Sequence, residues 1–491
     1  MRERILIVGS GIFNIFMVLF SNILVTRTYS KALLGTYQQA ILLYSSIAIL
    51  VSLGMPKAVL YFLYPGSNKK KTLWHIVICL SGALVFANVI LYLSWNWICS
   101  LFSNPDLQSF YFLILGNLFF RAFNELFAAV AVSVEKKSYI WHIEITTGLL
   151  LLVLSLWICY NSMPVSYLLF GNLFLEAIKT SALAHLLRYS QGEWTGFDRE
   201  LFGKILKYSF PLLLSIFTLL LARKIDSILI SCFLTPEVYA VYSRGALEIP
   251  LARILIFNIA LLMMPEVVQL YSQKKYEAIS AILHREIQRN ACLLIPLFFS
   301  FVLVHKDMMV LFYTEKYIES VPVFLVYLFY IPLQLYAFDT VLQAMNQNIK
   351  IFYISFIAII LQLIISIVLL HFWGILGPAL GALLACFLSN IFYLYFINKF
   401  LGISIKKWLP WKFLVKIYFL CFVCFGVFFM IACFIKIQLF FKISLLFGIS
   451  YIFQLFWIWQ SGIMNQQDKI LILQKIQKLL FLKKFFQGIL S

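Results

Sequence analysis

The chain has 491 residues, of which 63% are apolar, 12% are charged and 49 are phenylalanine. Water-soluble proteins are roughly 45–50% apolar and about 25% charged, so a soluble fold of this composition would expose large contiguous apolar patches. The composition therefore excludes a soluble globular protein and predicts an all-α, polytopic membrane protein. A spanning helix needs about 20 apolar residues. About 14 spans would use about 310 residues and leave about 180 for the connections and the tail.

Apolar segments broken by charged or turn-forming residues mark these predicted spans. In chain order they are residues 5–26, 36–63, 74–97, 109–133, 139–160, 166–187, 208–233, 237–264, 288–305, 320–346, 351–371, 376–398, 413–435 and 440–461. Lysine and arginine gather in alternate connections, and the opposite side has only Arg27, Lys31, Lys306, Lys316, Lys436 and Lys442. Because basic residues accumulate in cytoplasmic loops, we expect both termini in the cytoplasm.

The same distribution explains the net charge of +19 without nucleic acid as a partner. Residues 464–491 alternate apolar and Lys or Gln positions at helical spacing, which predicts an amphipathic helix on an anionic inner leaflet. A solvated helical tail is the alternative. The outer connections are short, which argues against a membrane polymerase or ligase with an external catalytic domain.

A weak internal repeat divides the chain. Met55-Pro56 recurs as Met264-Pro265, and Ala122-Phe123-Asn124 recurs as Ala337-Phe338-Asp339. Such repeats are common in transporters that move around a central site. We therefore expect an N-lobe of six helices over 1–190, a C-lobe of six over 191–400 and two extra helices over 401–463, followed by a cytoplasmic tail over 464–491.

Motifs of catalysis are nearly absent. The six histidines have no metal-ligand spacing, and neither a nucleophile elbow nor a phosphate-binding loop occurs. We expect no catalytic residue, no metal and no cofactor, and an ion gradient or the membrane potential as the available driving force.

Charged residues inside the predicted spans are the informative feature. They are Arg121, Glu125, Glu144, Glu176, Lys179, Arg223, Lys224, Asp226, Arg244, Glu248, Arg253 and Asp339. Each would cost roughly 2.5–3.5 kcal/mol if it faced lipid, so they must face a wet cavity or one another. Arg121/Glu125 and Arg244/Glu248 are spaced i,i+4, and Glu176/Lys179 and Arg223/Asp226 are spaced i,i+3, so each pair can meet on one helix face.

The seventh and eighth spans hold an excess of bases. Such an excess attracts an anion, and arginine matches phosphate because its planar fork donates two parallel hydrogen bonds. We predict that Arg223 and Arg244 bind the anionic group first, with Lys224 and Arg253 second. Arg121 faces them from the other lobe, and Asn117 extends its polar stripe by one turn. Purely structural pairing is the alternative for all of these residues.

The acids have two candidate roles. Glu125, Glu144, Glu176, Glu248 and Asp339 either neutralise bases or bind a coupling cation, and Lys179 and Asp226 belong to the pairing set. Glu144 and Asp339 have no base one turn away on their own helices. We therefore favour these two for ion coupling.

Three segments carry a resemblance to a known family: LLGTYQQAILLYSSIAILVSLGMPKAV, LQAMNQNIK and WGILGPALGALLA. Together with the span count and the repeat, they resemble the polysaccharide transporter family, the Wzx-type O-antigen and capsule flippases of the multidrug/oligosaccharidyl-lipid/polysaccharide exporter superfamily. The resemblance implies a two-lobed bundle in a bacterial inner membrane. It also implies movement of an undecaprenyl-diphosphate-linked oligosaccharide from the cytoplasmic to the periplasmic leaflet for lipopolysaccharide, capsule or exopolysaccharide synthesis.

On this interpretation the partners are the lipid-linked oligosaccharide, membrane lipid and proteins of polymer assembly, and the transport unit is a monomer. A cation-coupled multidrug antiporter remains an alternative, although antiporters of the superfamily usually have twelve spans. A membrane polysaccharide polymerase or ligase is a weaker alternative.

Overall fold

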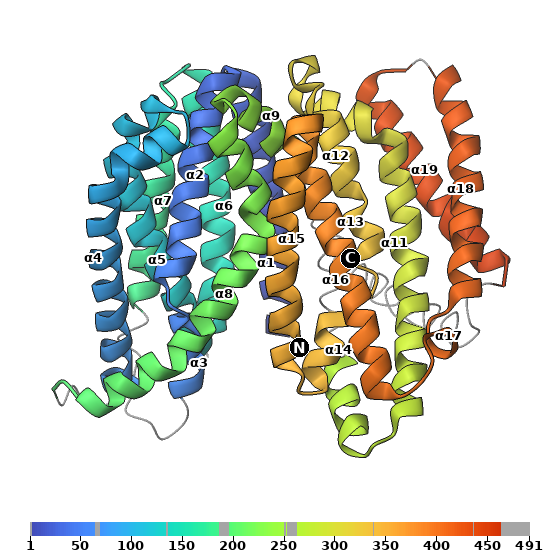
Figure 1. Ribbon diagram of the computed structural model, residues 1–491. Coiled ribbons are helices and arrows are strands. Elements are labelled where there is room, and N and C mark those ends of the chain that lie inside the picture. Colours follow the sequence, from blue (N-terminus) through green and yellow to red (C-terminus); the bar gives the residue numbers. More distant parts are fainter. Residues whose placement is uncertain are drawn as a thin grey trace, which may run out of the picture. The chain divides into compact units, whose positions relative to one another are not determined.

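The computed structural model describes residues 2–63, 69–133, 136–185, 196–249, 252, 263–336, 338–435 and 437–462. Within these ranges the chain forms helices joined by short connections and contains no strand (Figure 1). The predicted all-α, polytopic membrane fold is confirmed. The predicted amphipathic tail, 464–491, lies outside the described residues.

Twelve described helical segments are long and apolar enough to cross a membrane. They are Gly9–Thr28, Lys31–Phe62, Lys69–Leu101, Pro105–Ser133, Tyr139–Tyr160, Arg199–Thr218, Tyr276–Tyr313, Ser320–Ala344, Asn348–Trp373, Leu376–Leu401, Trp411–Phe434 and Leu439–Gln460. The predicted sixth span is also a helix, α7 (Ser166–Ala184), but it carries two charged residues and several polar ones. The predicted eighth span includes residues 250–251 and 253–262, which lie outside the described ranges. The predicted number of fourteen is therefore approximate.

Contacts within the chain define two compact units. The first contains Met1–Arg244 and Ser355–Ala382, and the second contains Gly245–Ile354 and Leu383–Ser491. The lobes expected over 1–190 and 191–400, with the extra helices over 401–463, were derived from the sequence repeat. The division into two compact units does not test these lobe boundaries, which stay a prediction.

The first unit is built around two helix pairs. α1 (Arg2–Thr28) packs along α6 (Lys137–Tyr160), and α5 (Tyr111–Ser133) packs along α7. The Ser21 and Ser155 hydroxyls lie 2.6 Å apart between α1 and α6. Buried hydroxyl pairs of this kind join helices where no water competes. α2 (Lys31–Val51) and α3 (Met55–Phe62) also pack on α5, and α4 (Lys69–Leu101) packs on α3 before the 3₁₀ turn Pro105–Phe110.

Two glycines permit close approaches in the first unit. Gly54 connects α2 to α3 with φ +71°, a conformation that favours glycine. A side chain there would also meet Leu212 Cβ of α8 (Arg199–Phe233) at 2.9 Å. At Gly35 of α2, a Cβ atom would lie 1.9 Å from the carbonyl oxygen of Pro236, where α9 (Pro236–Gly245) begins. Larger residues at either position would separate these helices.

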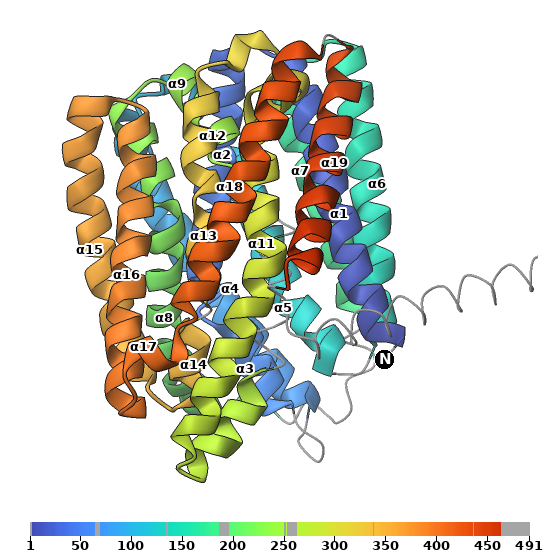
Figure 2. The ribbon, with the colours of Figure 1, turned by 90° about the vertical axis from the view of Figure 1, so that its right-hand side faces the viewer.

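The second unit is arranged along α11 (Tyr276–Tyr313), which is 38 residues long. It packs against α12 (Ser320–Leu328), α18 (Trp411–Phe434) and α19 (Leu439–Gln460), as Figure 2 shows. Ser450 of α19 donates to Ser300 Oγ of α11 at 3.1 Å, and Gln454 Nε2 donates to the same oxygen at 3.3 Å. All three side chains are buried. These bonds fix α19 to α11.

The predicted tenth span is broken. After α12 it continues as α13 (Tyr330–Leu333) and, beyond a turn, as α14 (Phe338–Ala344). Asn390 of α16 (Leu376–Leu401) donates to the Leu333 carbonyl, and Asn290 of α11 donates to the Leu335 carbonyl, both at 2.9 Å. A break within a membrane is tolerated only where other groups satisfy the freed carbonyls, and the two asparagines do so.

The remaining elements are α15, α17 and a second 3₁₀ turn. They cover Asn348–Trp373, Ile405–Trp408 and Glu315–Tyr317.

Candidate functional site

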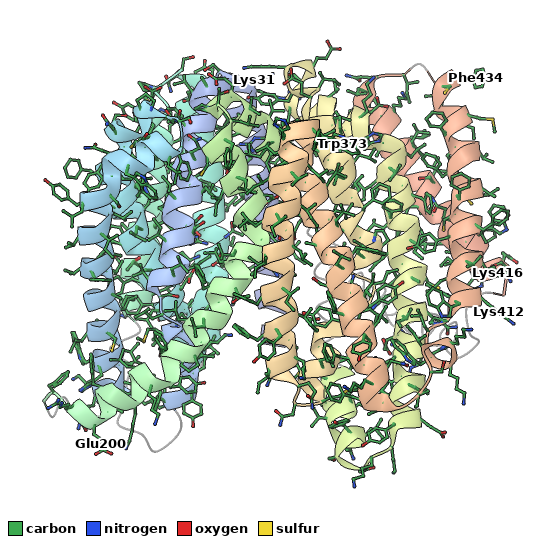
Figure 3. All side chains as sticks on the ribbon, in the orientation of Figure 1. Lys31, Glu200, Trp373, Lys412, Lys416 and Phe434 are labelled. Carbon is green, nitrogen blue, oxygen red and sulfur yellow. The ribbon has the colours of Figure 1, made fainter. Side chains whose placement is uncertain are left out.

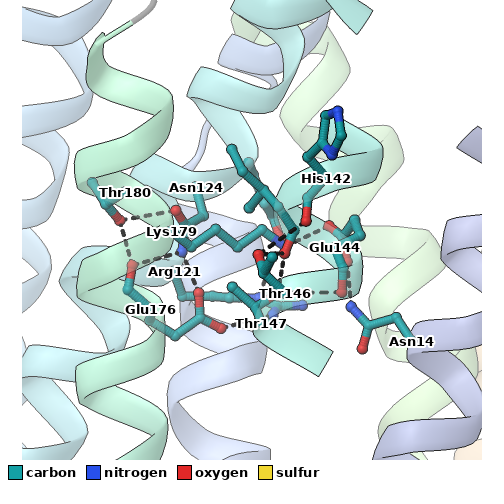
Figure 4. A network of polar contacts seen from close by, with 12 residues as sticks. Asn14, Arg121, Asn124, His142, Glu144, Thr146, Thr147, Glu176, Lys179 and Thr180 are labelled. Carbon is teal, nitrogen blue, oxygen red and sulfur yellow. Dashed lines mark hydrogen bonds and ion pairs between the residues drawn. The ribbon is translucent and has the colours of Figure 1, made fainter. Parts of the chain in front are cut away.

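Helices α5, α6 and α7 of the first unit bring five charged side chains into one network, which we call the acid–base cluster (Figure 4). Its members are Arg121, Glu125, Glu144, Glu176 and Lys179. Arg121 Nη1 of α5 lies 3.0 Å from Glu176 Oε1 of α7. The sequence spacing paired Glu176 with Lys179 on one helix, but the ion pairs of both residues reach neighbouring helices.

Two polar side chains orient the Glu176 carboxylate. Asn124 Nδ2 donates to this carboxylate and, at 3.1 Å, to the Glu176 backbone carbonyl. The Thr180 hydroxyl lies 2.9 Å from Asn124 Oδ1, and a bond there holds the amide with its NH₂ group toward Glu176. Sequence reasoning missed Asn124 and Thr180. Their spacing was the available signal, because Asn124 lies three residues after Arg121 and Thr180 lies four after Glu176.

Glu144 of α6 is bound from two other helices. Lys179 Nζ of α7 lies 2.5 Å from Glu144 Oε1, and Asn14 Nδ2 of α1 donates to the other carboxylate oxygen. The sequence analysis favoured Glu144 for ion coupling because its own helix offers no base. α7 supplies that base, so this reason no longer distinguishes Glu144 from the other acids.

Glu125 has the longest ion pair in the acid–base cluster. Its Oε1 lies 3.9 Å from Arg121 Nε, while Nη1 of the same guanidinium binds Glu176. The cluster contains three carboxylates and two bases, so it carries one negative charge when every member is ionised. Arg121 and Glu125 have 44% and 32% of their side chains exposed, the largest fractions in the cluster, and an excess of negative charge attracts a proton or a cation. We therefore expect Glu125, with the longest ion pair, to be the carboxylate that takes up the proton or cation.

The side chain of Asn117 is bonded to backbone carbonyls inside the first unit. Its side chain is fully buried, and its Nδ2 donates to the Leu113 carbonyl at 2.8 Å and to the Leu169 carbonyl at 3.1 Å. One amide hydrogen thus bonds within α5 and the other joins α5 to α7, which leaves this group little capacity to donate to a substrate.

The predicted anion-binding residues lie on α8 and α9. Arg223 and Lys224 are exposed on α8, whereas Arg244 is 4% exposed at the end of α9. These three bases and Arg121 belong to the first unit. Arg253 lies outside the described residues. Arg223 and Lys224 are therefore accessible on α8, and their part in binding an anion stays a prediction.

Asp226 bonds to another helix. The Tyr242 hydroxyl of α9 donates to Asp226 Oδ2 at 2.6 Å, and both side chains are buried. This bond ties α8 to α9 and fixes the helices that carry Arg223 and Arg244.

The last two predicted acids belong to the second unit. Glu248 is exposed in the non-helical stretch 246–249, and Asp339 is exposed in the first turn of α14. Their part in ion coupling stays a prediction. Among the residues that the structure describes, no three His, Cys, Asp or Glu side chains are grouped to hold a metal.

Comparison with protein families gives one match, to a family described as "Polysaccharide biosynthesis protein", over residues 40–322. This range covers more than half of the 491 residues. The chain belongs to this family. No protein of curated function matches the sequence. The resemblance found in the sequence, to a family of polysaccharide synthesis, is therefore confirmed.

Solved structures show which fold this polysaccharide biosynthesis protein has. "Lipid II flippase MurJ, inward closed conformation" superposes with a TM-score of 0.74 at 14% identity, over 94% of this chain and 100% of that one. An inward-facing multidrug resistance MATE family transporter of the MOP superfamily gives 0.65 at 13% identity, over 80% and 96%. A MOP superfamily transporter from Pyrococcus furiosus gives 0.55 at 14% identity, over 82% and 96%. At these identities the likeness establishes the fold, which is that of membrane transporters.

Proposed function

We propose that this protein is a flippase that moves an undecaprenyl-diphosphate-linked oligosaccharide from the cytoplasmic to the periplasmic leaflet of a bacterial inner membrane by alternating access. One observation carries the proposal: a member of a polysaccharide biosynthesis family has the fold of a lipid II flippase. A flippase breaks no bond. It needs a polar path for the sugar and diphosphate while the polyprenyl chain stays in lipid, and charged side chains within membrane helices supply polar groups for such a path.

The bases of α8 and α9 would bind the diphosphate. Arg223 and Arg244 are the first candidates, Lys224 and Arg253 the second, and Arg121, which binds Glu176, the third. Replacing Arg244 with Lys keeps the charge but removes the bidentate fork. We expect flipping to fall about tenfold or more, the equivalent of one charge-assisted hydrogen bond, while insertion and thermal stability are retained. Normal flipping by Arg244→Lys and by the Arg223→Ala, Arg244→Ala double variant would reject this headgroup site.

Deletion of the gene tests the function in cells. If the protein is the flippase, the deletion strain accumulates the lipid-linked oligosaccharide on the inner leaflet and loses the surface polymer, whether this is O-antigen, capsule or exopolysaccharide. A plasmid copy restores the polymer, and a copy with Arg223→Ala and Arg244→Ala does not. Unchanged surface polymer in the deletion strain would reject the proposal.

A cation-coupled multidrug antiporter is the second candidate, because MATE transporters share the fold. The carboxylate excess of the acid–base cluster would suit a cationic substrate. The same deletion strain separates the two functions, since an antiporter predicts new drug sensitivity with normal polymer.

A further inference from the structure

The connection from α16 to α18 and the first turns of α18 carry a dense group of bases. Lys406, Lys407, Lys412 and Lys416 are all exposed, and we call these four residues the basic surface. Figure 3 shows Lys412 and Lys416 projecting outward from one end of α18. The sequence contains no Asp or Glu between Asp339 and Asp468. Neighbours in the sequence therefore cannot neutralise these lysines.

The polypeptide beneath the basic surface is held firmly in the second unit. Trp408 is fully buried, its carbonyl accepts a hydrogen bond from His284 Nδ1 at 3.0 Å, and its ring lies edge-on to Phe338 at 6.1 Å. Leu409 is buried beside it. These anchors fix α17 to α11, so Lys406 and Lys407 stay on the outer side of the turn.

The helix α11 pairs its own charges at this end of the second unit. Arg289 Nη1 lies 3.0 Å from Glu286 Oε1, and Arg285 Nε lies 3.6 Å from the same oxygen. The stretch 276–289 of α11 contains two acids, Glu277 and Glu286, and these two arginines, so its formal charges balance. The positive charge of the basic surface therefore comes from its four lysines.

α18 presents its two lysines on a face that is not packed within the protein. Leu414, Ile417 and Cys421 are buried, whereas Val415 and Trp411 are 68% and 49% exposed. On a membrane helix such an exposed apolar face meets lipid. Lysine side chains near a helix end extend to the level of the headgroups, and tryptophan is enriched there.

We propose that the basic surface binds the headgroups of anionic phospholipids, such as phosphatidylglycerol, in the leaflet at that end of α18. Four fixed cations beside a lipid-facing helix complement a layer of phosphates, and each lysine near an anionic surface strengthens its attraction. A soluble anion would not use the apolar face of α18 next to these lysines. The site is independent of transport activity and does not rest on the proposed function.

The test uses the full-length protein in phosphatidylcholine nanodiscs that contain a trace of photoactivatable phosphatidylglycerol or photoactivatable phosphatidylcholine. Crosslinks are mapped by mass spectrometry to the peptide that contains α17 and the start of α18. We expect phosphatidylglycerol to crosslink there in preference to phosphatidylcholine. Changing Lys406, Lys407, Lys412 and Lys416 to Gln should reduce this preference by about tenfold or more.

The matched control removes four charges from other connections predicted on the same side, with Lys69, Lys70, Lys274 and Lys275 changed to Gln. It should keep the preference at α18, and thermal unfolding in phosphatidylcholine nanodiscs checks that both variants are folded. An equal loss in the control would show general attraction without a site, and no preference in the unaltered protein would also overturn the proposal. Displacement of the crosslink by extracted lipid-linked diphosphate, but not by excess phosphatidylglycerol, would assign the surface to that lipid instead.

Discussion

In the first unit, residues of opposite charge form ion pairs between helices, and these pairs contribute to the free energy of unfolding. Glu144 receives Lys179 and Asn14 from two other helices. Replacing Glu144 with Gln leaves a partly buried lysine without its carboxylate, which should lower the free energy of unfolding by about 1–3 kcal/mol. A second change, Lys179→Met, should restore most of this loss, and denaturant titration in detergent measures both. Equal stability of Glu144→Gln and the unaltered protein would contradict the pairing.

Glu125 is the residue we expect to couple transport to an ion gradient, because the acid–base cluster has one carboxylate in excess and Glu125 has the longest ion pair. Glu125→Gln should leave the Arg121–Glu176 pair and thermal stability intact. Flipping driven by a pH or sodium gradient should become independent of that gradient. The comparison variant is Asp339→Asn, which alters the exposed acid of the second unit that the sequence favours for the same role. If Glu125→Gln keeps its dependence on the gradient, Glu125 is not the coupling residue. If Asp339→Asn loses that dependence, Asp339 has the coupling role instead.

Asp198 caps α8 outside the membrane-spanning segment. Its carboxylate accepts hydrogen bonds from the Leu201 N–H at 3.0 Å and from Lys71 Nζ at 2.9 Å. These bonds to the charged form lower the pKa of Asp198 to about 2, with the Leu201 bond as the largest cause. A carboxylate with a lowered folded pKa contributes stability above its unfolded pKa, and this contribution is lost as the pH falls from ~4 to ~2.

Asp198→Asn should therefore lower the melting temperature near neutral pH, and the difference from the unaltered protein should shrink as the pH approaches ~2. Thermal unfolding across this pH range measures the effect. Glu277→Gln, which changes an exposed carboxylate in the first turn of α11, controls for the loss of one acid. A difference for Asp198→Asn that stays constant with pH would show that its charge is not responsible.

At the scale of the helices, the sequence was sufficient to place nearly all spans, because a bilayer demands long apolar segments. It was not sufficient to pair the charges. Spacing shows which side chains share a helix face, but the rotation of α5 against α7 decides that Arg121 meets Glu176. The break between α13 and α14 was also missed, since it depends on Asn290 and Asn390, two distant residues that satisfy its carbonyls.

The orientation of the helices is a further prediction at this scale. In a variant without native cysteines, single cysteines at Ser103, Ser162 and Thr314 should react with an impermeant thiol reagent in intact cells. Cysteines at Ser67, Ser190 and Gln273 should react only after the cells are opened, because we expect the lysine-rich connections to be cytoplasmic. Labelling of the second group in intact cells would reject the predicted topology with both termini inside.

For the molecule as a whole, the class of protein could be predicted from composition and charge placement, and the family from three short segments. The candidate site was only partly predictable. Its charged members could be recognised because charges within apolar spans are costly. Asn14, Asn124 and Thr180 are ordinary polar residues, and only the packing of the helices shows that they contact the charged members. The bases of α8 and α9 keep their proposed task, which rests on charge and on the arginine fork.

The most direct test of the flippase is transport by the purified protein. The lipid-linked oligosaccharide accumulated by the deletion strain is extracted, labelled on its sugar with a fluorophore and reconstituted with the protein into vesicles. An impermeant quencher then reports the labelled lipid in the outer leaflet. We expect the protein to make nearly the whole labelled pool accessible, while the Arg223→Ala, Arg244→Ala variant leaves the inner-leaflet share protected. The account would be contradicted if the labelled lipid of the inner leaflet stayed protected from the quencher in vesicles that contain the folded, unaltered protein, under every ion gradient applied.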